Sequence, residues 1–494
     1  MKEQQEIFKR MSIWSASMRH IRFWILFILS GIFIYLSQNS LLYSAVKSSP
    51  NGHGEQESSH GTVTGSQIEK EDKAPSAGHD EKNISGAAAG EHPDTGKEDK
   101  GHSDVEGDKD AEHGKEEAHG APGEGYIGLK NGTPIDKEVL KAFRERVTSE
   151  AMSKGKLDMA RFIFFAFSFL WVWLAFNHTG KLEAAGKKIR KIIDWYTLGT
   201  VTGLILIVLV IPSGIIITFF YMPTSTGVYP STEYMTVQPA LAFFRNLHNW
   251  SSEVFIWLLL LHAARTVSTR TFLGNRKFIW LAGAIASAIG WVAFLTGSFM
   301  RGDQEAFEGF IHMMYSFTLF PGGSIISDFF SGELTLIRLT TVHIIATIFI
   351  MAIFLSLHTL MRKVHKLVTH YWKKAALYSG VVTLFLVIQS FLMEAPFVRG
   401  LGSIPSVSGV EYTKPPWPIY FLIQGENWFG ADAMVAILTV VFLPLIVFPY
   451  VIEFLPISTQ KKNIVGEIGF YIGVALVILI SYIAAAGPIQ AHIS

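Results

Sequence analysis

The chain has 494 residues, of which 49% are hydrophobic and 17% charged, so it is too apolar for an average soluble protein. It contains no cysteine, which excludes disulfides, thiolate zinc sites, cysteine-ligated iron–sulfur clusters and covalently attached haem on this chain. Any redox cofactor must therefore use other ligands, and histidine is the obvious one. The net charge of +1 argues against a nucleic-acid-binding protein.

The first 155 residues contain one apolar stretch followed by a long polar segment. Residues 21–43 fit either a membrane span or a signal peptide, and a small-residue site that ends at Ala45 keeps both interpretations open. Residues 46–155 are predicted to be disordered, because the stretch 46–125 holds almost no large apolar side chain and is rich in acidic residues and histidine. Either interpretation of the first stretch places this segment outside the cytoplasm.

From about Lys156 the composition inverts, and eight apolar runs are long enough to cross a bilayer. Together with the doubtful N-terminal run, they predict an all-α, multi-pass bundle of eight or nine spans. Basic clusters fall on alternate connections, which places the long connections 299–333 and 394–430 outside the cytoplasm. Residues 178–194 are expected to form a basic amphipathic helix on the cytoplasmic surface. The eight runs are 157–177, 195–221, 244–268, 277–298, 334–361, 375–394, 431–452 and 464–486.

Four histidines lie in two of these runs at matched spacing. His248 and His262 are 14 residues apart, and His343 and His358 are 15 apart. At about 100° per residue each pair points to one face of its helix, and its members are roughly 21 to 22 Å apart along the axis. Because a single run lies between the two histidine-bearing runs, both of those helices enter the membrane from the outside. We therefore expect His248 opposite His343 near the outer surface and His262 opposite His358 near the inner surface.

Each facing pair can supply two axial imidazoles to a haem iron, which needs no cysteine. The sequence thus predicts two noncovalent haem b groups, an outer one and an inner one. Arginines near the two membrane levels are candidates for the haem propionates, and glycines for close approach of the porphyrin. Membrane anchoring by the arginines and helix packing at the glycines are the alternatives. These residues are Arg245, Arg265 and Arg338, with Gly199, Gly214, Gly283 and Gly297.

The motifs around the histidines point to a known family. The segments RNLHNW, LHAARTV, TGSFMRGDQ, LTLIRLTTVH and LHTLMRK resemble the cytochrome b subunit of quinol:cytochrome c reductases, the bc complexes. The resemblance is strong over about 190–370 and weaker over 375–486. It is closest to the chloroplast and split bacterial form, here with the core and the small subunit fused. That form also carries a covalent haem on a cysteine, and because the matching position is Thr197, we expect no such haem.

The resemblance implies a redox enzyme subunit in the cytoplasmic membrane of a bacterium. In this family quinol is oxidised near the outer face, and one electron leaves through a Rieske iron–sulfur protein to a c-type cytochrome. The other electron crosses through the two haems to a quinone at the inner face, and this is coupled to proton translocation. The implied partners are those two proteins, quinone, membrane lipid and a second copy of the complex, as a homodimer.

The outer quinol site of the family includes a Pro-Glu-Trp-Tyr motif whose glutamate accepts a proton. The matching stretch here reads KPPWPIYFLIQGENW, with Pro416 in place of that glutamate. Glu426, with Gln424 close by, is the candidate replacement, because a desolvated carboxylate can accept a proton. Trp417 and Tyr420 are candidates for packing against the quinone ring.

Two other functions stay open. One keeps the haems but makes the chain a membrane anchor between the quinone pool and another oxidoreductase, without electron bifurcation, and Pro416 favours it. The other is a metal-ion transporter with a histidine-rich tail, which would need carboxylates beside the intramembrane histidines.

The sequence divides into five predicted parts. These are 1–45, a span or signal peptide; 46–155, the disordered segment; 156–194, an extra span and a surface helix; 195–370, the dihaem core; and 371–494, a three-span quinol-site region.

Overall fold

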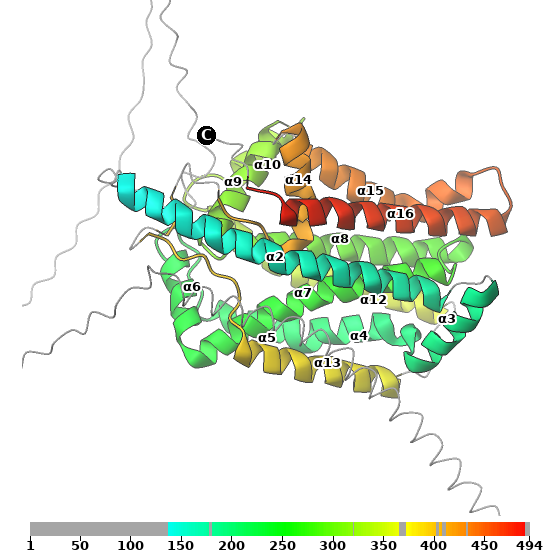
Figure 1. Ribbon diagram of the computed structural model, residues 1–494. Helices are drawn as coiled ribbons and strands as arrows, with labels where there is room; N and C mark the ends of the chain where they lie inside the picture. Colours follow the sequence, from blue (N-terminus) through cyan, green and yellow to red (C-terminus); the bar gives the residue numbers. More distant parts are fainter. Residues whose placement is uncertain are drawn as a thin grey trace, which may run out of the picture. The chain divides into compact units, whose positions relative to one another are not determined.

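The computed structural model describes residues 137–176, 180–319, 321–364, 372–401, 405–407, 412–430 and 433–489. Within these ranges the chain is α-helical and contains no β-strand, so the predicted all-α bundle is confirmed. The long helices lie side by side in Figure 1. The expectations for residues 1–45 and for the polar segment up to residue 136 fall outside the described part of the chain.

Each of the eight predicted runs falls on a helix or on a succession of helical segments. These are α2 (Lys137–Ala175), α4 (Leu198–Ile205) with η2 (Leu206–Val210) and α5 (Ile211–Thr218), α7 (Pro239–Ser268), α8 (Lys277–Phe299), α11 (Thr335–Ile344) with η4 (Ile345–Ile350) and α12 (Met351–Val364), α13 (Trp372–Leu392), α15 (Ala433–Phe454) and α16 (Thr459–Ala486). The shorter helices are α3 (Gly180–Ile192), α6 (Val228–Val237), α9 (Gln304–Thr318), α10 (Gly323–Phe329) and α14 (Tyr420–Phe429), with turns η1 (Trp195–Thr197), η3 (Gly274–Arg276) and η5 (Trp417–Ile419).

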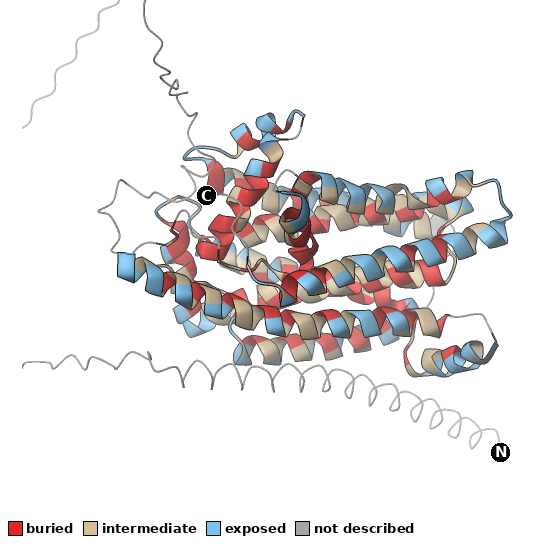
Figure 2. Cartoon of the chain, turned by 45° about the horizontal axis from the view of Figure 1, so that its top comes forward, coloured by how far each residue is buried: buried red, intermediate tan, exposed pale blue. Residues whose placement is uncertain are grey.

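Among the described helices, seven are long and apolar enough to cross a membrane, and α7 is not one of them. Helix α7 carries two histidines as well as Asn249, Glu253 and Arg265. It packs against α2, α4, α5, α6 and α13, so these polar side chains have protein neighbours. Figure 2 shows the buried residues on the inward faces of the helices and the exposed ones on the outer faces. The large apolar side chains exposed there, such as Phe219 and Phe454, are suited to lipid contact.

Two of the membrane-length successions contain a π-helical turn. The segments η2 and η4 each form this wider turn in the middle of an otherwise α-helical span. A π turn accommodates one extra residue within an α-helix. In a regular α-helix, a residue 15 positions on would point about 60° beyond the face of the first residue. In the structure η4 lies between His343 and His358 and takes up the extra residue, so their spacing is equivalent to the 14 residues of α7.

Helix α2 begins at Lys137, so the prediction that residues 46–155 are disordered is wrong over 137–155. The reason is a four-residue period of buried apolar side chains, Phe143, Val147 and Ala151, which is typical of one face of a helix. Phe143 and Val147 pack with Val407 in a small hydrophobic cluster. The average composition of the polar segment concealed this short periodic stretch. The predicted helix in 178–194 is present as α3, and its place on the cytoplasmic surface stays a prediction.

The long connection between α13 and α14 is held by three helices. From α2, Lys154 Nζ donates to the Lys414 carbonyl at 2.7 Å, and Lys414 Nζ donates in turn to the Ala485 carbonyl of α16 at 2.6 Å. From α9, Glu308 accepts from the Thr413 backbone N–H at 2.9 Å. Burial raises the pKa of Glu308 to about 7 and lowers that of Lys414 to about 8. These contacts fix the start of η5 and α14 against the bundle.

Candidate functional site

The structure brings the four histidines together in the two pairs that their spacing predicts. The imidazoles of His248 and His343 have ring centroids 6.3 Å apart at an interplanar angle of 73°. The imidazoles of His262 and His358 are also 6.3 Å apart, at 79°. Both pairs therefore join α7 to the α11–α12 succession, one pair toward each end of these helices. Their roles as ligands stay a prediction.

Each histidine ring packs against one of the four predicted glycines. A Cβ placed on Gly199 would lie 2.6 Å from His262 Cε1, and one on Gly214 would lie 2.8 Å from His248 Cε1. On α8, Gly283 and Gly297 make the same contact with His358 and His343, at 3.1 and 3.0 Å to the nearest ring atoms. The glycines of these two spans thus leave room for imidazole rings, whereas their predicted role was close approach of a porphyrin.

Backbone carbonyls orient three of the four rings. His248 Nδ1 donates to the Val210 carbonyl, His343 Nδ1 to that of Ala293 and His358 Nδ1 to that of Ile279, each at 2.9 Å. Each acceptor lies four residues before the glycine that faces the same ring. Because Nδ1 carries the hydrogen, Nε2 keeps its lone pair for a ligand bond.

His262 is the exception among these rings. Its Nδ1 is buried without a hydrogen-bond partner. Four residues before its glycine, Gly199, stands Trp195, whose carbonyl accepts from Leu198 in the 3-10 turn η1. Helix α4 begins only at Leu198, so the Trp195 carbonyl belongs to the preceding turn and does not bond to His262 as the corresponding carbonyls do to the other three rings.

Both pairs have the ring separation that a metal bound between them requires. Metal–nitrogen bonds of about 2 Å, and about 1.1 Å from a ring nitrogen to its centroid, place two opposed imidazoles roughly 6.2 Å apart. At the observed 6.3 Å, both imidazoles of a pair would be able to bind one haem iron. Among the described residues there is no group of three or more His, Asp or Glu side chains arranged to hold a metal ion.

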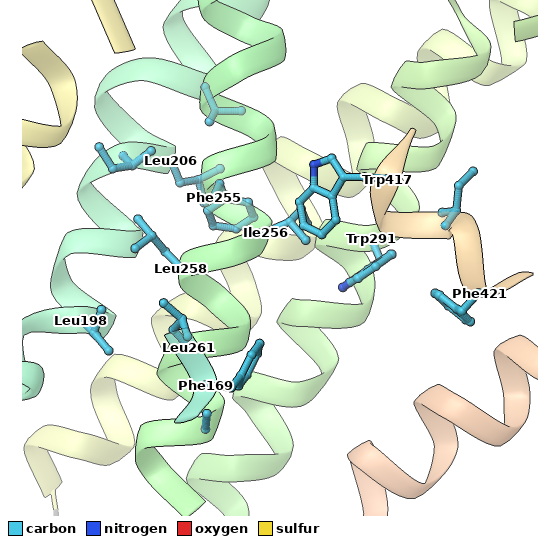
Figure 3. Close-up of a cluster of buried hydrophobic side chains, with 14 of the residues drawn as sticks. Phe169, Leu198, Leu206, Phe255, Ile256, Leu258, Leu261, Trp291, Trp417 and Phe421 are labelled. Carbon is cyan, nitrogen blue, oxygen red and sulfur yellow. The ribbon is translucent and has the colours of Figure 1, made fainter. Parts of the chain in front are cut away.

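A cavity of about 410 Å³ adjoins the outer pair. Its lining includes His248 and His343, and also Pro416 and Trp417 from the connection that leads to α14. Trp417 Nε1 donates to Glu253 Oε2 at 3.1 Å. Figure 3 shows Trp417 within the buried cluster that includes Phe255 and Ile256 of α7. The outer histidines and the predicted quinol-site segment thus share one cavity.

The other predicted quinol-site residues are buried but do not line this cavity. Tyr420 is fully buried and donates from its hydroxyl to Asp158 Oδ2 at 3.0 Å, and burial raises its pKa well above the ordinary value. Glu426 is buried and accepts from His312 Nδ1 at 2.6 Å, so it is not an exposed loop residue. Gln424 is buried on the same helix, α14.

The three predicted arginines have different surroundings. Arg245 lines the cavity and donates to the Pro396 carbonyl at 2.8 Å. The guanidinium carbon of Arg265 lies over the ring of Tyr196, 4.5 Å from its centroid. Arg338 donates to the Phe329 carbonyl at 2.6 Å and does not line the cavity, so the structure does not bring it to the outer histidines.

A group of charged residues in the cavity wall was not predicted from the sequence. Lys154 and Arg161 reach it from α2, which precedes the resemblance to the cytochrome b core. Lys154 pairs with Glu305 at 2.8 Å, and Arg301 pairs with the same carboxylate at 2.9 Å. Burial alone would raise the pKa of Glu305, but the Arg301 and Lys154 cations hold it below its ordinary value. The signal was Arg161 within an apolar run, where a charge is costly and usually functional.

Comparison with known proteins assigns the segment that carries the histidines. The family model described as Cytochrome b/b6/petB matches residues 185–366. Cytochrome b6 of Prochlorococcus marinus (strain NATL1A) is 27% identical over 179 residues, which are 34% of this chain and 79% of that protein. Cytochrome b6 of Mastigocladus laminosus is 28% identical over 174 residues, 34% of this chain and 80% of that protein.

A solved chain described as "Hyperthermophilic respiratory Complex III" covers 58% of this chain and 92% of its own length, at 15% identity and a TM-score of 0.44. This structural similarity is too low to add to the assignment. All four histidines lie within the matched segment, and residues 185–366 are thus similar to the cytochrome b family.

Proposed function

We propose that this membrane cytochrome b binds two haem b groups and carries electrons from quinol across the membrane within a bc-type respiratory complex. His248 with His343 would hold the outer haem iron, and His262 with His358 the inner one. The haems would supply one-electron redox chemistry at two levels of the bilayer. The observation that carries the proposal is the equal 6.3 Å separation of both imidazole pairs.

The protein's own part is to position the ligands and to separate the two levels. The glycine contacts and the carbonyl bonds to Nδ1 fix the rings before any ligand binds. At about 1.5 Å per residue, 14 residues of α7 separate the two levels by roughly 21 Å. Quinol would be oxidised in the outer cavity and quinone reduced at the inner face, with proton translocation across the cytoplasmic membrane of a bacterium. A Rieske protein, a c-type cytochrome and a second copy of the complex are the proposed partners.

One observation favours a second function. Pro416 lines the outer cavity and offers no group that could accept a proton. A haem b anchor that passes electrons between the quinone pool and another oxidoreductase, without bifurcation, would need no proton acceptor at this position if it does not oxidise quinol in the outer cavity. Quinol-dependent reduction of cytochrome c by the purified complex distinguishes the two functions, because only the first predicts it.

The test of the haem assignment is a reduced-minus-oxidised visible spectrum of the purified protein. We expect a b-type α-band that corresponds to two haems per chain, and about half of its amplitude in His248→Ala and in His343→Ala. His312→Ala is the matched control, since His312 is a buried histidine bonded to Glu426 and should leave the band unchanged. A full band in both ligand variants would overturn the assignment.

A further inference from the structure

We propose that Glu253 accepts the proton released by quinol in the outer cavity, with Arg161 of α2 and Trp417 as its positioning residues. The inference rests on the proposed function, because it names the base of that same site. Quinol can lose an electron to an iron–sulfur partner only if an O–H bond breaks, with its electron pair left on the quinone oxygen. The proton must then form a bond to a nearby base, here a carboxylate oxygen of Glu253.

The position of Glu253 suits this role. It lies on α7, five residues after His248, and both side chains line the same cavity. Its Oε1 accepts from Asn249 Nδ2 at 3.2 Å, and its Oε2 accepts from Trp417 Nε1 at 3.1 Å. Each oxygen therefore has one fixed donor and retains a lone pair for a proton that arrives from the cavity.

The cations near Glu253 do not fully balance the carboxylates there, which favours uptake of one proton. Arg161 Nη1 lies 2.8 Å from Asp158 Oδ1 and 3.7 Å from Glu253 Oε2, so one guanidinium stands between two carboxylates. Lys154, the other cation that α2 brings to the cavity, pairs at 2.8 Å with Glu305. The group Asp158, Arg161 and Glu253 thus carries one surplus negative charge in a buried place, and a single added proton would neutralise it.

The other carboxylates near the site are less suited. Asp158 has the closer contact with Arg161, and its second oxygen accepts from the Tyr420 hydroxyl. Glu426 pairs with His312 and does not line the cavity. Glu305 is shared by two cations, which favour its ionised form. Glu253 lines the cavity, and its contact with a cation, at 3.7 Å from Arg161 Nη1, is longer than a hydrogen bond.

The pH dependence of the step would be set by every charged or titratable group that faces this cavity. The groups that line it are Lys154 and Arg161 of α2, Tyr221 after α5, Arg245 and His248 of α7, His343 of α11, Arg301 before α9 and Glu305 on α9. Asp158 and Asp303 do not line the cavity, but they pair with Arg161 and Arg301.

The experiment measures the rate of quinol-dependent cytochrome c reduction by the purified complex between pH 5.5 and 9. Decylubiquinol and a menaquinol analogue are the donors. We expect the wild-type rate to rise with pH as the acceptor ionises, and Glu253→Gln to lose at least about tenfold in rate together with that rise. Glu453→Gln is the matched control, because Glu453 pairs with Lys277 on the α8–α15 side and does not line the cavity.

Three further measurements keep the inference separate from folding and from the proposed function. The α-band of each variant reports whether both haems are present. Trp417→Phe removes one donor to Glu253 but keeps an aromatic ring, so the rising part of its pH profile should move to higher pH. Arg161→Lys should retain more rate than Arg161→Gln.

The outcomes are distinct. A haem-loaded Glu253→Gln complex with the wild-type rate and pH profile overturns the inference alone, as does an unshifted Trp417→Phe profile if the Gln variant does not assemble. Loss of rate in Glu426→Gln with no change in Glu253→Gln also overturns it. A wild-type complex that never reduces cytochrome c overturns quinol oxidation in the proposed function instead.

Discussion

At each histidine a single missing side chain makes room for the imidazole. The four glycines lie 14 or 15 residues apart on their spans, as the histidines do on theirs, and each faces one ring. A methyl group at any of these positions would come closer to the ring than van der Waals contact allows. The effect should be largest at Gly199 and Gly214, where the added methyl group would lie 2.6 and 2.8 Å from a ring atom and the imidazole would have to move.

We therefore expect Gly199→Ala to displace His262 and to remove about half of the b-type absorbance. Its Cβ would lie 2.6 Å from His262 Cε1. Gly203→Ala on the same helix is the control, because a Cβ there meets no atom within 4 Å, and alanine is favoured over glycine in a helix by about 1 kcal/mol. Equal haem content in the two variants, measured from the pyridine haemochrome, would contradict the prediction.

The sequence was informative where a rare residue type recurs at a regular interval. Histidine within an apolar run is costly, so four of them at matched spacing predicted both pairs. The partners of Glu426 and Tyr420 were not predictable, because they depend on which helix packs beside α14. Arg338 shows the same limit, since its spacing placed it near the outer pair whereas its side chain bonds to the end of α10.

Among the secondary-structure elements, the π turns were not predictable from hydropathy. A π turn alters hydrogen bonding over a few residues and leaves the apolar composition of the span unchanged. The eight runs themselves were predictable because each is set by about 20 apolar residues. The start of α2 was missed for the opposite reason, since its apolar residues are few and widely spaced.

The π turn η4 predicts that one residue can be deleted from its span without loss of either histidine pair. Deletion of Phe349, an exposed side chain in η4, would leave 14 residues from His343 to His358 and should turn η4 into regular helix. Deletion of Leu259 in α7 should instead rotate His262 by about 100° relative to His248 and abolish the inner haem. Haem content per chain distinguishes them, and loss of haem on deletion of Phe349 would show that η4 does not compensate the spacing.

On the scale of the whole molecule, the absence of cysteine in the chain permits a direct test of the predicted topology. Figure 1 shows α3 at the end of the helices opposite to α6, α9 and α10. In spheroplasts, Ser331→Cys should react with a membrane-impermeant maleimide, and Lys187→Cys only after permeabilisation, because basic clusters remain inside. Both residues are exposed, so each thiol would be reachable. The reverse labelling pattern would invert the proposed orientation.

The cavity wall drawn from α2 and from Trp417 has a consequence for dissection of the molecule. Residues 185–366 contain every histidine of the two pairs, so this segment holds all of the proposed haem ligands. Arg161 and Trp417, which contact Glu253, lie before and after that segment. A shortened chain that retained only the family segment would keep both histidine pairs. It would lose the two residues that position the proposed proton acceptor. In this protein, proton release at the outer cavity would then depend on sequence on both sides of the family segment.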